Sequence, residues 1–154
     1  MELSIMSAII TDIYSQLTRD EGVRLHVYPD SRGFNTIGIG HNLDANPLPN
    51  YDLDNFTLDD AEQVLRDDGV RIWAKLYRDL PWLSNIAAVR QGVYQNMSFN
   101  MGAGGVENFH HSLADAQAGN YAQAALDMQA SAWYTEVGAR AVRLCTQMRT
   151  GVWQ

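Results

Sequence analysis

Two short segments, residues 23–28 and 35–40, constrain the fold more than any other feature of this chain, because apolar and polar side chains alternate in them. A period of two is the pattern of a half-buried β-strand and does not fit a helix. The residues between the two segments, Pro29-Asp30-Ser31-Arg32-Gly33, are a cluster of turn formers. The sequence therefore predicts an antiparallel β-hairpin, preceded by the end of a helix.

Most of the remaining chain shows helical periodicity. An amphipathic N-terminal helix is predicted by four apolar residues spaced four apart, Ile5, Ile9, Ile13 and Leu17. Residues 57–60 resemble a capping box, and the helix that they begin extends to Pro81. Residues 82–154 predict shorter helices, with a break at the glycine-rich residues 102–105.

We therefore expect a single domain of the α+β class, mainly helical, with two lobes. The β-containing lobe, which would hold the cleft, spans about residues 18–60, and a connecting helix spans about 57–80. The helical lobe comprises about residues 81–154 together with the N-terminal helix. A chain of 154 residues is long enough to bury a core of this size.

The net charge of −7 is located in one part of the chain. Residues 41–70 contain eight acidic residues and a single basic one, so that this segment alone carries the whole net charge. A nucleic-acid groove needs the opposite sign, and we expect no nucleic-acid partner.

Cys145 is the only cysteine, which excludes an intrachain disulfide. We also expect no signal peptide and no membrane segment, because the N-terminus is acidic and its apolar run is short.

Two carboxyl groups and a hydroxyl group fall in or beside the predicted hairpin: Glu21, Asp30 and Thr36. Cleavage of a glycosidic bond needs one protonated carboxyl as general acid and a second, ionised carboxylate to activate water or attack the sugar. Taken singly, each residue has a structural interpretation. Glu21 is typical of a helix end, Asp30 of a turn, and Thr36 of a strand.

The spacing of these residues resembles the active-site segment of the phage-type lysozyme (endolysin) family, which the T-even phage enzyme typifies. Asp20-Glu21-Gly22, Asp30, and Thr36 through His41 stand where that family has the same residues. Further matches in order cover about residues 17–153, among them Thr57-Leu58-Asp59-Asp60 and Arg149-Thr150-Gly151. The resemblance implies a lysozyme-like fold.

The resemblance also implies roles for individual residues. Glu21 would be the general acid, Asp30 the general base or charge stabiliser, and Thr36 the residue that positions the attacking water. Phe99 and Ser112 match positions that contact the glycan. Supporting residues would be Arg140, beside the catalytic glutamate, and an ion pair between the lobes formed by His41 and Asp68. Four positions depart from the family pattern and put cleft closure and subsite preference in question: Arg32, Asn42, Asp127 and Ala132.

By resemblance, the chain would be a muramidase that hydrolyses the β-1,4 bond between N-acetylmuramic acid and N-acetylglucosamine in peptidoglycan, with inversion. No metal or organic cofactor is implied. We expect a monomer that accumulates in the host cytoplasm and reaches the wall through a holin pore, acting in host cell lysis. The alternatives are a catalytically silent peptidoglycan-binding relative and a tail-associated lysozyme.

Overall fold

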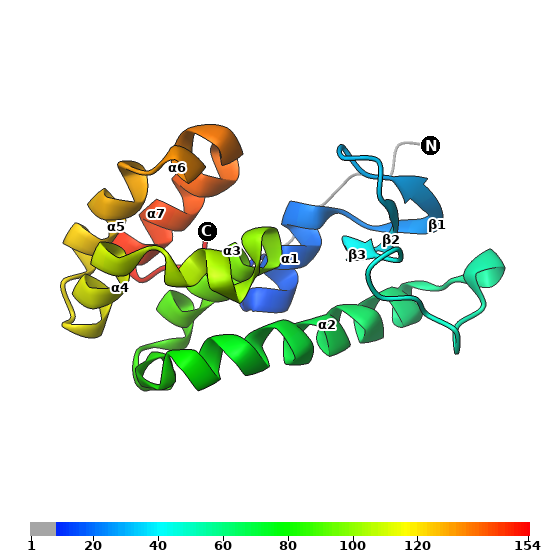
Figure 1. The fold of residues 1–154 in the computed structure, drawn as a ribbon, viewed down its shortest axis with the longest axis horizontal. Helices are drawn as coiled ribbons and strands as arrows, with labels where there is room; N and C mark the ends of the chain where they lie inside the picture. The colour runs from blue at the N-terminus through cyan, green and yellow to red at the C-terminus, as the bar shows by residue number, and fades with distance from the viewer. Residues whose placement is uncertain (1–8) are drawn as a thin grey trace. The chain divides into compact units, whose positions relative to one another are not determined.

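A computed structural model describes residues 9–154 of the chain (Figure 1). Three strands and a series of helices follow one another along the chain. In order, these elements are α1 (Ile13–Glu21), β1 (Arg24–Pro29), β2 (Asn35–Gly38), β3 (His41–Asn42), the 3₁₀ turn η1 (Leu53–Asn55), α2 (Leu58–Asp79), the 3₁₀ turn η2 (Pro81–Asn85), α3 (Ala88–Glu107), α4 (His110–Gln117), α5 (Tyr121–Gln129), α6 (Ala132–Val137) and α7 (Ala139–Thr150). The predicted class, α+β and mainly helical, is confirmed.

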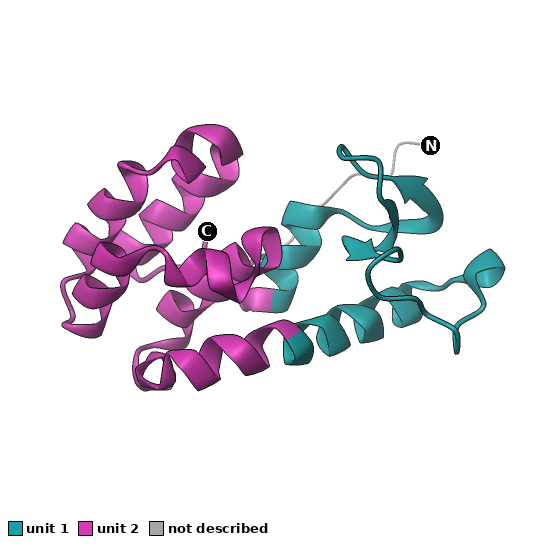
Figure 2. Ribbon diagram, in the orientation of Figure 1, with its two compact units in different colours: residues 1–9, 14–71 teal, residues 10–13, 72–154 magenta. Residues whose placement is uncertain are grey.

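The chain divides into two compact units (Figure 2). Of the described residues, unit 1 contains Ile9 and residues 14–71, and unit 2 contains residues 10–13 and 72–154. Helix α2 therefore contributes to both units. The N-terminal helix differs from our expectation, because most of α1 belongs to unit 1 and not to the helical unit. One reason is a contact with α2 inside unit 1, where the guanidinium of Arg66 lies 4.4 Å from the centre of the Tyr14 ring.

Helix α1 is shorter than the apolar spacing predicted. Ile5 lies outside the described residues, and Ile9 precedes the helix with 83% of its surface exposed. Of the three members of the predicted stripe that the structure describes, Ile13 and Leu17 are buried. The helix ends at Glu21 and is followed by Gly22, which has a positive φ of 72° and whose N–H donates to the Thr18 carbonyl at 3.0 Å.

The three strands form an antiparallel sheet in the order β1-β2-β3. The predicted hairpin is therefore present, but its predicted buried face is wrong: Val23 and Val27 are 40% and 46% exposed. The pairing of β1 with β2 shifts between Arg24 and Tyr28, as at a β-bulge, which breaks the strict alternation of faces. Strand β2 is instead buried on both faces over residues 36–38.

Helix α2 follows the prediction closely. Thr57 and Asp60 form a reciprocal capping box at its start, because each side chain accepts a hydrogen bond from the other residue's N–H. The helix runs for 22 residues, and Pro81 begins the next element two residues after its end.

Unit 2 is a group of packed helices in which α5 contacts both α4 and α7, and α7 contacts α3 and α6. Its core includes the fully buried side chains of Tyr94, Met97, Met128, Leu144 and Met148. The predicted break at residues 102–105 is a single kink at Gly102, after which α3 continues to Glu107. Among residues 9–154, no helix is both long enough and apolar enough to cross a membrane.

Candidate active site

All three residues with a predicted catalytic role lie in unit 1. Glu21 is the last residue of α1, Asp30 begins the turn after β1, and Thr36 is the second residue of β2. The hairpin register places Thr36 opposite Tyr28, two residues before Asp30. The local sequence therefore brings a strand residue and a turn residue to the same end of the hairpin.

The carboxylate of Asp30 is held by the backbone of its own turn. Its Oδ1 accepts hydrogen bonds from the N–H groups of Arg32, at 2.8 Å, and of Phe34, at 2.9 Å. These bonds favour the ionised form, the bond from Phe34 most strongly, and together with the charge of Arg32 they outweigh desolvation. The pKa of Asp30 is therefore lowered below its ordinary value. An ionised carboxylate is the form that a general base or a charge stabiliser requires.

The hydroxyl group of Thr36 is almost completely buried and has a fixed donor direction. Thr36 is 4% exposed, and its Oγ1 donates to the carbonyl of Phe34 at 2.9 Å. Because a hydroxyl has one proton, the remaining lone pairs of Oγ1 can only accept hydrogen bonds. The Oγ1 atom of Thr36 can therefore accept, but not donate, a hydrogen bond with a water molecule while this bond to Phe34 is present.

The peptide groups on either side of Phe34 connect these two side chains. The Phe34 N–H donates to the Asp30 side chain, while the Phe34 carbonyl accepts from the Thr36 hydroxyl and from the Asp30 N–H at 2.9 Å. Phe34 was not among the predicted site residues. Its side chain gives no signal of this role, because the groups involved are backbone atoms that any residue except proline would supply in this turn.

The carboxyl group of Glu21 lies against the backbone of Gly40, in the turn between β2 and β3. A Cβ atom built on Gly40 would lie only 2.7 Å from Glu21 Oε2. Glu21 itself is half-buried. The structure therefore places the predicted general acid beside the second strand of the hairpin, at the end opposite to the turn that holds Asp30.

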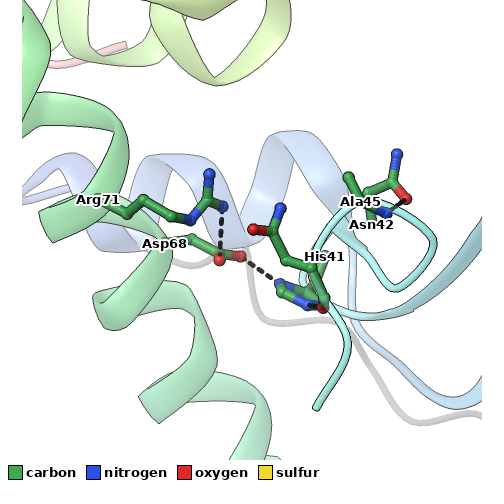
Figure 3. A network of polar contacts seen from close by, with 6 residues as sticks. His41, Asn42, Ala45, Asp68 and Arg71 are labelled. Carbon is green, nitrogen blue, oxygen red and sulfur yellow. Dashed lines mark hydrogen bonds and ion pairs between the residues drawn. The ribbon is translucent and has the colours of Figure 1, made fainter.

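His41 and Asp68 form a buried ion pair (Figure 3). His41 Nδ1 lies 2.7 Å from Asp68 Oδ2, and His41 Nε2 lies 2.7 Å from the carbonyl of Asn46. Asp68 lies between His41 and Arg71, which donates to Oδ1 at 3.0 Å. The pair was expected between two lobes, but both residues belong to unit 1. Its place is therefore inside one unit, where it joins β3 to α2.

Burial lowers the pKa of His41, but the hydrogen bond and negative charge of Asp68 outweigh that effect and raise the pKa above its ordinary value. Both partners of the ring, a carboxylate and a carbonyl, are hydrogen-bond acceptors. Both ring nitrogens must therefore donate, which is the hydrogen-bonding pattern of the charged imidazolium.

The loop after His41 has its own polar anchors. Asn42, one of the departures from the family pattern, accepts a hydrogen bond from the N–H of Ala45 at 3.0 Å and so closes an Asx-type turn (Figure 3). Asp44 binds Asn35 on β2 through both carboxylate oxygens, at 2.9 and 3.2 Å. Asp44 is one of the eight acidic residues of segment 41–70 and was not a predicted site residue, because no local signal indicates a contact between residues nine positions apart.

The remaining predicted site residues lie in unit 2. Phe99 is half-buried, with its ring centre 5.7 Å from that of Trp73. Ser112 is 1% exposed, and its hydroxyl lies 2.9 Å from the Tyr94 hydroxyl. Arg140 Nε donates to the Asn96 side chain at 2.8 Å.

Two of the departures from the family pattern also lie in unit 2. Ala132 is the first residue of α6. Asp127 and Ser112 line a hollow of about 290 Å³ together with Phe109, His110 and Ser131. The fourth departure, Arg32, is in the hairpin turn of unit 1, where its guanidinium lies 5.4 Å from the centre of the Phe34 ring. In the described part of the chain, no group of three His, Cys, Asp or Glu side chains could hold a metal ion.

Comparison with known proteins identifies the family of the chain. The profile of the phage lysozyme family matches residues 18–149. The chain is 31% identical to the pre-baseplate central spike protein Gp5 of Enterobacteria phage T4, over 88% of this chain but only 27% of that protein's length. It is 27% and 26% identical to the probable T4-type lysozymes 1 and 2 of Dictyostelium discoideum, over 93% of this chain and 96% of each relative. Since the family match covers most of its length, the chain belongs to the phage lysozyme family, a family of glycoside hydrolases.

Proposed function

We propose that this chain is a muramidase that hydrolyses the β-1,4 bond between N-acetylmuramic acid and N-acetylglucosamine in peptidoglycan, with inversion at the anomeric carbon. In this mechanism Glu21 donates its proton to the leaving glycosidic oxygen. Asp30 accepts a proton from the attacking water, which Thr36 orients. Phe99 and Ser112 would contact the glycan.

The observation that carries this proposal is the anchoring of Asp30 and Thr36 on Phe34. The lowered pKa of Asp30 keeps its carboxylate ionised, and Thr36 can offer only acceptor lone pairs. A water molecule that donates one hydrogen to each group would turn its own lone pair away from both, toward a sugar in the cleft. Two groups that accept hydrogen bonds from the same water molecule would orient that water for direct attack on the sugar. Direct attack by water is the mechanism of inverting glycosidases.

Clearing of a turbid suspension of purified cell walls would test the hydrolase. Wild-type protein should clear the suspension, whereas Glu21→Gln, which keeps the size of the side chain but cannot act as an acid, should lose at least about 100-fold in rate. NMR of the first products should show the α-anomer if the reaction inverts. Equal clearing by both proteins would contradict the role of Glu21, and an initial β-anomer would contradict inversion.

The catalytically silent alternative predicts that one of the three groups is missing, but Glu21, Asp30 and Thr36 are all present. It is tested by the same suspension: a protein that sediments with the walls but does not clear them would be a binding relative. The presence of the complete set favours the enzyme.

For the biological setting, we propose that the chain acts in host cell lysis, as a cytoplasmic monomer that reaches the wall through a holin pore. The similarity to a phage spike protein supports a second setting, a lysozyme carried on the tail. Immunoblots separate the two. The chain should appear in purified phage particles if it is tail-associated, and only in the host cytoplasm before lysis if it depends on a holin.

A further inference from the structure

Gly40 is the residue whose missing side chain leaves space for the carboxyl group of Glu21. A Cβ atom on Gly40 would lie 2.7 Å from Oε2, 3.0 Å from Cδ and 3.1 Å from Cγ of Glu21. Cβ atoms in proteins essentially never come within 3.0 Å of another heavy atom, and ordinary van der Waals contacts begin at 3.4 Å. Every non-glycine residue carries a Cβ, so all of them would meet this contact.

The other glycines of the hairpin show that this contact is specific to Gly40. Gly33, Gly38 and Gly40 all have positive φ angles, of 87°, 68° and 68°. A Cβ on Gly33 would meet nothing within 4 Å, and a Cβ on Gly38 would meet Phe56 and Ala61 at 3.2 Å or more. All three positions therefore require a positive φ, which favours glycine, but of the three only Gly40 lies against the predicted general acid.

We propose that Gly40 is a positioning residue for Glu21, and that the absence of its side chain sets where the acidic proton is delivered. A Cβ at position 40 meets the far end of a flexible side chain, which moves more easily than backbone. To restore an ordinary contact, the carboxyl group must shift by about 0.7 Å or more. The effect of a substitution thus falls on the location of the carboxyl group.

The catalytic consequence rests on the proposed function. Proton transfer to the leaving oxygen requires hydrogen-bond contact, and a displacement near 1 Å can cost about 100-fold in rate. Gly40→Ala should therefore lower kcat on cell walls by about 100-fold while KM stays within about twofold, because Glu21 acts on the scissile bond and not on the bound glycan as a whole.

Gly119→Ala is the matched control, because it adds the same methyl group at a positive φ, of 83°, where a Cβ meets nothing within 4 Å. Gly119 is exposed between α4 and α5 in unit 2 and lies outside the turn that holds Asp30. The variant should keep kcat within about threefold of wild type. Gly38→Ala adds a methyl group against Phe56 and Ala61 and reports the effect of crowding alone. Circular dichroism at the assay temperature verifies that each variant is folded.

Crystal structures of wild type, Gly40→Ala and Gly119→Ala test the inference without an activity assay. The Glu21 carboxyl group should move by at least about 0.7 Å in Gly40→Ala only. An unmoved carboxyl group in Gly40→Ala would overturn the inference, and so would a kcat equal to that of Gly119→Ala. The proposed function fails separately, if wild type and Glu21→Gln act equally on walls, and the structures still decide the role of Gly40 in that case.

Discussion

Replacement of Asp68 by asparagine should destabilise the protein in a pH-dependent manner. In the wild type, buried His41 donates to Asp68 from Nδ1 and to Asn46 from Nε2, so the ring is charged while the pair is intact. An amide at position 68 can donate to Nδ1, and the ring can then remain neutral with one N–H directed at Asn46. The variant therefore loses a charge pair and keeps its hydrogen bonds.

The loss in the free energy of unfolding depends on the interactions that His41 keeps in the variant. Removing one partner of a buried ion pair costs about 3–5 kcal/mol when the other charge is left unpaired. His41 escapes this cost in Asp68→Asn by releasing its proton, so the loss should be nearer the value of one charged hydrogen bond, about 1.5–3 kcal/mol. Asp68→Ala, which offers no partner to Nδ1, should reach the upper range.

The sign of the pH dependence follows from the raised pKa of His41. The folded state holds the proton more tightly than the unfolded state, in which the pKa of a histidine is about 6.5. The contribution of the pair is therefore complete below pH 6.5 and is lost as the pH rises through the pKa of the folded state. The difference between wild type and Asp68→Asn should be largest near pH 5.5 and should shrink at alkaline pH.

Urea unfolding at several pH values measures this difference, and an NMR titration of the His41 ring follows the pKa directly. Asp67→Asn is the control, because it removes the same charge from the neighbouring position of α2, where Asp67 is exposed. A loss in Asp68→Asn that is the same at every pH would refute the reasoning. An unchanged His41 titration in that variant would also refute it.

Three further outcomes are expected. Asp127→Asn should raise the melting temperature at pH 7, because the contact with Asp127 raises the pKa of Asp115. A raised carboxyl pKa destabilises the folded state only above the ordinary pKa of the group, so the gain should be present at pH 7. An unchanged melting temperature would contradict this expectation. Leu17→Ala should lower the free energy of unfolding in urea by about 2.7–5 kcal/mol, because Leu17 is fully buried. A loss below about 1 kcal/mol would contradict this, because it would mean that neighbouring side chains fill the cavity. Added salt should slow wall clearing less than it slows a basic relative, because a chain of net charge −7 is not attracted to an anionic wall; a steeper loss would contradict this.

The helices were predictable where local signals agree with the tertiary structure. Helix α2 has a capping box at its start and a proline just after its end, and both act as the sequence indicates. Helix α7 ends at Gly151, which adopts the left-handed conformation expected of a C-terminal glycine. The division at residue 130 was not predicted. There α5 ends and α6 begins with Ser131 as its N-cap, although the apolar spacing continues through the junction.

The hairpin was predictable as an element but not in its packing. Alternation in residues 23–28 indicates a strand, yet the pairing shift between Arg24 and Tyr28 leaves Val23 and Val27 exposed. Residues 24–28 contain no glycine that would indicate a bulge, and the shift appears only in the pairing with β2. The same limit applies to Asp44, whose contact with Asn35 forms only after the chain has folded back.

Side-chain identity indicated the candidate catalytic groups, whereas backbone atoms determine where those groups lie. The peptide groups around Phe34 hold Asp30 and Thr36, and the Cβ-free backbone of Gly40 leaves space for Glu21. Every residue except proline supplies both an N–H and a carbonyl, so other substitutions of Phe34 that preserve the turn should leave the two bonds intact. The absence of a Cβ is supplied by glycine alone. Position 34 therefore excludes only proline, whereas position 40 requires glycine. A hairpin with all three candidate groups but a larger residue at position 40 should hold Glu21 elsewhere.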